Sequence, residues 1–102
     1  MKLELERLHP RRIYANAKWK LEDDKLIQSI IPSENAQESI SFTLNPGDNI
    51  RLDGEVYHVT SHQRAYEQKG NSRVYHFIYK IKKGCYTPPK WMEIGEVQKE
   101  RG

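Results

Sequence analysis

Hydrophobic and polar residues alternate along most of this chain, which is the period-two pattern of β-strands that bury one face. The alternation runs through residues 2–8, 12–21 and 39–44, and it is longest between residues 49 and 83. Turn-forming residues separate these stretches. The pattern therefore predicts an all-β fold of five to six short antiparallel strands joined by tight turns.

Two turn sequences define a three-stranded meander in the second half of the chain. Asp53-Gly54 stands between two alternating runs and predicts a hairpin turn of type I′. Lys69-Gly70-Asn71 predicts a second hairpin with a three-residue loop, in which Gln68 faces Ser72. In this register the odd-numbered positions share the core face: Ile50, Tyr57, Val59, Tyr75, Phe77, Tyr79 and Ile81.

The stretch from Lys25 to Ile31 fits two structures. A helix capped by Asp23 would place its four large apolar residues on one face. Its β-branched residues, its short length and the following Pro32 favour a strand instead. We expect the strand.

After Gly84 the regular alternation of apolar and polar residues ends, and two adjacent prolines follow. Both features indicate extended structure. We therefore expect one small domain over residues 1–84 and an extended tail over residues 85–102. The tail either shields an open edge of the sheet or binds a partner through an aromatic anchor. The candidate partner-binding residues are Trp91, Met92 and Ile94.

The phrase from Pro46 to Val59 is a turn followed by Asp-x-Ile and then by Gly-x-x-Tyr-x-Val. It resembles SH3-like barrels in general, including small accessory proteins of phages and mobile elements. The resemblance covers about a dozen residues and consists mostly of turn chemistry. Together with the number of strands, it implies a small, partly open SH3-like or OB-like barrel.

Composition narrows the class of protein. Seventeen Lys and Arg against fourteen Asp and Glu give a net charge of +3, which is compatible with an anionic partner. Cys85 is the single cysteine, so an internal disulfide is excluded, and no apolar run approaches the length of a membrane span. We expect a cytoplasmic protein that does not contact membranes.

The other face of the meander carries mostly cations. In the predicted register Arg64 lies beside His76, and His58 lies beside Lys82. Small barrels use cations and aromatic rings together to hold nucleic-acid backbones and stack bases, whereas a solvated outer face needs no ligand. The predicted anion-binding residues are His58, His62, Arg64, Tyr66, His76, Lys80 and Lys82.

The histidines and serine of the meander give little support for a catalytic site or a metal site. His58 and His62 lie ~13 Å apart along a strand, too far to share one ion. Ser61 and His62 point to opposite faces and cannot form a nucleophile–base pair. We therefore expect neither a metal, nor a cofactor, nor an enzyme.

Two functions remain. The first is a binding module that contacts nucleic acid, or another anionic partner, through the basic hairpin face. The second is a subunit for protein interaction or assembly, as a homo-oligomer or with another protein, through the tail or an open strand edge.

Overall fold

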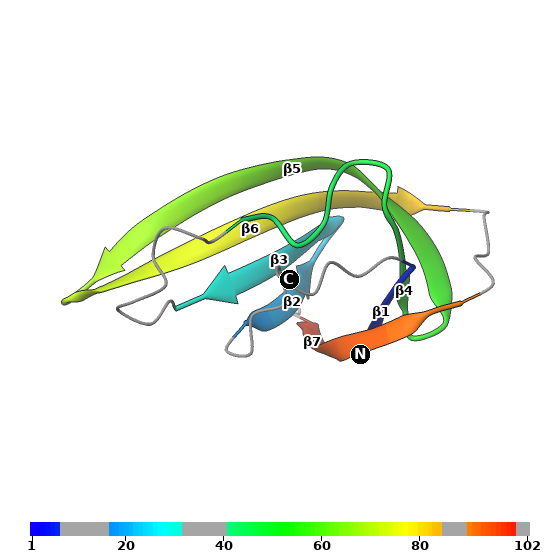
Figure 1. The fold of residues 1–102 in the computed structure, drawn as a ribbon, viewed down its shortest axis with the longest axis horizontal. Coiled ribbons are helices and arrows are strands. Elements are labelled where there is room, and N and C mark those ends of the chain that lie inside the picture. The colour runs from blue at the N-terminus through cyan, green and yellow to red at the C-terminus, as the bar shows by residue number, and fades with distance from the viewer. Residues whose placement is uncertain (7–16, 32–40, 85–89, 100–102) are drawn as a thin grey trace.

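The computed structural model of this protein describes residues 1–6, 17–31, 41–84 and 90–99, and within them every regular element is a β-strand. The strands close into a barrel in the order β1-β4-β5-β6-β3-β2-β7 (Figure 1). Their bounds are β1 Lys2–Leu5, β2 Lys18–Glu22, β3 Lys25–Ile30, β4 Asn49–Leu52, β5 Glu55–Lys69, β6 Ser72–Lys83 and β7 Met92–Lys99.

The all-β prediction is confirmed, and two of its details are wrong. The barrel has seven strands rather than five to six, and it is closed rather than partly open. Closure comes from β7, which pairs antiparallel with β1 and parallel with β2. The expected tail therefore contributes a barrel strand to the domain that was predicted to end at residue 84.

An irregularity in the pairing of β7 with β1 explains why the sequence pattern did not predict this strand. The register against β1 shifts where Leu3 faces Gly95 and Glu4 faces Glu93, so that Ile94 is an extra residue. Such a β-bulge breaks the alternation of inward and outward side chains. As a result Ile94 and Val97 both pack against the core although three positions separate them.

The stretch from Lys25 to Ile30 is a strand, as expected. Leu26, Gln28 and Ile30 alternate inward, and β3 pairs with β2 on one side and β6 on the other. The barrel interior is apolar apart from a few polar groups. Its largest buried side chains are Tyr79, Phe77, Leu3, Leu5, Leu26, Leu44, Ile50, Leu52, Gln28 and Val59.

A polar network crosses this interior. The Tyr79 hydroxyl donates to Gln28 Oε1 at 2.9 Å and accepts from the Thr43 backbone N–H at 3.0 Å. Gln28 Nε2 in turn donates to Thr43 Oγ1 at 2.8 Å. Because buried polar groups are costly unless they are paired, this network fixes the segment around Thr43 against β3 and β6.

A partly buried ion pair joins β1 to β4. Arg51 donates to both Glu4 carboxylate oxygens, at 2.8 and 2.6 Å. The hydrogen bonds from Arg51 hold the pKa of the Glu4 carboxyl below its usual value. The Arg51 guanidinium also lies 5.0 Å from the centre of the Trp91 ring, a cation–π distance that ties the residue before β7 to β4.

Candidate nucleic-acid interface

The hairpin of β5 and β6 is much longer than the barrel needs. Figure 1 shows both strands running across the top of the molecule and extending beyond β3. β4 pairs only with residues 55–58 of β5, and β3 pairs only with residues 75–80 of β6. The part of the hairpin from residue 61 to residue 75, most of which lies beyond these contacts, is called the arm below.

The turn at the end of the arm differs from the predicted one. Lys69 faces Ser72, so the loop contains two residues, Gly70 and Asn71, rather than three. Gly70 has a positive φ of 60°, whereas the φ of Asn71 is not positive. Glycine at the first central position is typical of a type II′ turn, which continues the twist of the strands.

The shorter turn moves the register of the arm by one residue. Arg64 faces Phe77 rather than His76, and the predicted Gln68–Ser72 pairing is wrong. Near the barrel the predicted register is correct, since Val59 faces Ile81. A β-bulge between Val59 and Ser61 takes up the difference, because Thr60 faces no residue of β6 in the strand register.

The register change divides the predicted anion-binding residues between two faces. His62, Arg64 and Tyr66 share a face with the inward-pointing side chains of β6. The other four stay on the outer face of the sheet, and the structure does not bring them into one stripe with the first three. We call this second set the outer row: His58, His76, Lys80 and Lys82.

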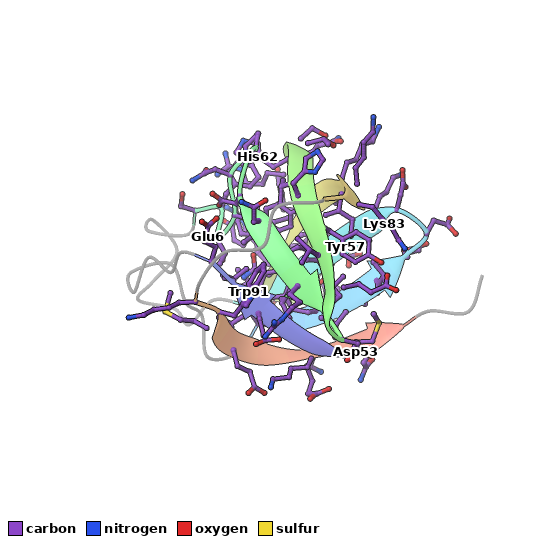
Figure 2. The ribbon with its side chains drawn as sticks, turned by 90° about the vertical axis from the view of Figure 1, so that its right-hand side faces the viewer. Glu6, Asp53, Tyr57, His62, Lys83 and Trp91 are labelled. Atoms are coloured by element: carbon purple, nitrogen blue, oxygen red, sulfur yellow. The ribbon has the colours of Figure 1, made fainter. Side chains whose placement is uncertain are left out.

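His62 belongs to the structure of the barrel end. Its ring stacks on Phe42 with centroids 3.7 Å apart, and its Nδ1 lies 3.3 Å from the Leu44 carbonyl oxygen. In Figure 2 His62 lies near the top, far from the Asp53 turn at the bottom. These contacts give the ring a structural role in holding the segment around Phe42 on β5.

His76 is held by partners on two neighbouring strands. Its Nδ1 lies 2.8 Å from Ser29 Oγ on β3, and its Nε2 lies 2.9 Å from Glu67 Oε1 on β5. The hydrogen bond with His76 holds the pKa of Glu67 below its usual value.

Serine, histidine and carboxylate are also the parts of a nucleophile–base chain. However, the amides of β3 bond to strands on both sides, so β3 offers no pair of free N–H groups to stabilise an oxyanion.

Four residues on the remaining face of the arm form a cluster of cations and rings, which we call the arm face: Arg64, Tyr66, Arg73 and Tyr75. Tyr66 faces Tyr75 across the strands, with ring centroids 6.3 Å apart at 39°. The Arg73 guanidinium lies 5.9 Å from the centre of the Tyr66 ring. Tyr66 is 66% exposed, and both arginines are exposed.

The charge of the arm face is uniformly positive. Neither Arg64 nor Arg73 makes an ion pair with any residue that the structure describes. Glu67, the only carboxylate in the arm sequence, lies on the opposite face and binds His76 and Lys69 there. The arm face therefore carries two guanidinium groups that no described carboxylate pairs with, together with an exposed aromatic ring.

Sequence reasoning identified half of the arm face. It selected Arg64 and Tyr66, assigned Tyr75 to the core and did not select Arg73. Tyr75 is half-buried and touches the core, but its ring also reaches Tyr66. The Gly70-Asn71 pair could have predicted the arm face, because reading it as a two-residue loop places Tyr66 opposite Tyr75 and Gln68 opposite Arg73.

The candidate partner-binding residues of the tail mostly contact this chain. The Arg51 guanidinium lies 5.0 Å from the centre of the Trp91 ring, and the Trp91 indole N–H is buried and has no hydrogen-bond partner among the described residues. Ile94 packs on the core, while Met92 is 38% exposed. An anchor free to enter a partner would be more exposed than Trp91 and Ile94 are.

The described residues hold no group of three or more His, Cys, Asp or Glu side chains able to bind a metal ion. They also contain no helix long and apolar enough to cross a membrane. Cys85 lies outside the described residues.

The chain matches no protein-family model, no curated protein and no solved structure at a significant level.

Proposed function

We propose that this protein is a non-catalytic binding module that holds single-stranded nucleic acid on the arm face. The observation that carries the proposal is the exposed Tyr66 ring between Arg73 and Tyr75, on a face whose two arginines have no carboxylate partner among the described residues. The pI of about 9.0 agrees with an anionic ligand.

Each part of the arm face has a role in this proposal. An exposed tyrosine offers its ring to any base, and stacking on such a ring contributes roughly 1–3 kcal/mol per base. Arg64 and Arg73 contact phosphates on either side, which adds affinity that does not depend on sequence. A base in a duplex is already stacked, so the arm face favours a single strand.

The experiment is a fluorescence-anisotropy titration with a labelled oligothymidylate and with a duplex of equal length, at low and at physiological salt. The double variant Arg64→Glu with Arg73→Glu should weaken binding of the single strand at least about tenfold, through charge repulsion and lost phosphate contacts. Tyr66→Ala should cost about fivefold or more through the lost stacking. Salt should weaken wild-type binding.

A matched control uses the outer row. Lys80→Glu with Lys82→Glu makes the same change in net charge on exposed residues of the other face. This variant should keep most of the affinity. A larger loss in this control than in the arginine variant, or no binding by the wild type, would refute the assignment to the arm face.

An assembly function has one observation in its favour, the edge of β5 beyond residue 59. No described strand pairs with residues 60–69 on the side away from β6. Such an edge can accept a strand from another chain. Light scattering on the samples used for the titration separates the two functions, because a defined oligomer that binds no oligonucleotide supports assembly.

A further inference from the structure

A groove of about 350 Å³ lies on the outer face of the barrel, apart from the arm face. It covers β2, β3, β6 and the start of the arm, which lie side by side in Figure 1. Ile27 and Ile78 face each other across β3 and β6 and form its floor together with Ala65. The volume is at the lower end of the range for small-molecule sites.

Two lysines border this floor from the same side. Lys20 faces Ile27, and Lys18 faces Ser29, so both side chains stand on the outer face of β2. Lys20 lies 3.6 Å from Glu22 in an exposed ion pair, whereas Lys18 has no ion pair with a described residue. No carboxylate is among the described residues that line the groove. The charge of the rim therefore complements an anion.

Ser29 and His76 supply the polar group in the wall of the groove. Glu67 can only accept a hydrogen bond, so His76 carries a proton on Nε2 and offers Nδ1 to the Ser29 hydroxyl. The Ser29 hydroxyl therefore donates to His76 within the wall, and the positive charge at this end of the groove comes from Lys18.

We propose that the groove binds a small organic acid, with its apolar body on Ile27, Ile78 and Ala65 and its carboxylate beside Lys18. A neutral molecule of the same shape would bury the same apolar area but leave Lys18 without a partner. A highly charged ligand such as a polyphosphate would place its other charges over isoleucine. The combination of an apolar floor and one lysine without an ion-pair partner among the described residues selects a monoanion.

The test is an NMR titration of the isotope-labelled protein with 2-naphthoate, and with 2-naphthamide as the neutral analogue. Naphthoate should bind more tightly than naphthamide, with the largest amide shifts at Ile27, Ser29 and Ile78. Lys18→Met keeps the apolar stem and removes the charge, so it should weaken naphthoate about fivefold and leave naphthamide unchanged. Lys82→Met, outside the groove, is the matched control.

A second variant tests the location of the site. Ala65→Trp fills the groove from an exposed position and should abolish binding of both compounds without changing the melting temperature. The proposal is overturned if naphthoate does not bind at millimolar concentration, if the two compounds bind equally, or if the shifts lie elsewhere. Oligonucleotide binding by the same variants measures the arm face separately.

Discussion

The side chain of Tyr79 contributes both to the packing of the barrel core and to its buried hydrogen bonds. Its ring is fully buried and lies 6.2 Å from the ring of Trp19. Its hydroxyl binds Gln28 and Thr43, two other buried polar residues. The alternation of residues predicted the buried ring, but the pattern carried no sign of the hydroxyl's partners, which come from distant segments.

Replacing Tyr79 by phenylalanine should lower the free energy of unfolding by about 1–3 kcal/mol, because Gln28 Oε1 loses its donor inside the core. Chemical denaturation followed by circular dichroism measures the change. Tyr57→Phe is the matched control, since its hydroxyl makes an exposed contact with Glu55 and should contribute less than about 0.5 kcal/mol. Equal losses in the two variants would show that the buried network adds no stability.

At the scale of elements, the β5–β6 hairpin is governed by its turn. The Gly70-Asn71 turn sets the register of the arm, and the bulge at Thr60 reconciles that register with the barrel. Gly70 has the positive φ that residues with a Cβ adopt at a cost. The turn at Gly70-Asn71 and the bulge at Thr60 therefore decide which side chains make up the arm face.

Gly70→Ala should destabilise the arm by about 1–2 kcal/mol, because alanine is strained at the glycine's backbone conformation. Amide hydrogen exchange should then quicken in residues 61–75 more than in the barrel strands. Asn71→Ala, at the neighbouring turn position without positive φ, is the control and should leave exchange nearly unchanged. Exchange that quickens uniformly, or equally in the two variants, would contradict an independent role for this turn.

The whole molecule depends on strands from both ends of the chain. β7 lies between β1 and β2, and the Met1 ammonium group donates to the Val97 carbonyl oxygen at 2.8 Å. Ile94 and Val97 add to the core from this last strand. Removing β7 would uncover that core and leave two strand edges unpaired.

A chain ending at Lys90 should therefore lose its cooperative thermal transition. Val97→Ala provides a graded version and should cost about 1–2 kcal/mol from the buried methyl groups it removes. Gln98→Ala, at an exposed position on the same strand, should have little effect. A truncated protein that melts at the wild-type temperature would show that β7 is dispensable for the barrel.

Much of the fold was predictable because its signals are local. The Asp53-Gly54 turn has positive φ at both residues, as the sequence predicted. The alternation in β1 and β4 identified their buried apolar residues. For the candidate site, the sequence identified Arg64 and Tyr66 but grouped them with residues that lie on the other face. The alternation alone could not locate the bulge at Thr60.

The sequence by itself determined the β class, the order of the hairpins and the concentration of cations along β5 and β6. These follow from period-two alternation and from turn residues, which act over a few neighbouring positions. Only the tertiary structure decided the closure by β7, the arm face and the groove on the outer face. Each of these depends on pairing between segments far apart in the chain, where a bulge of one residue changes which side chains meet.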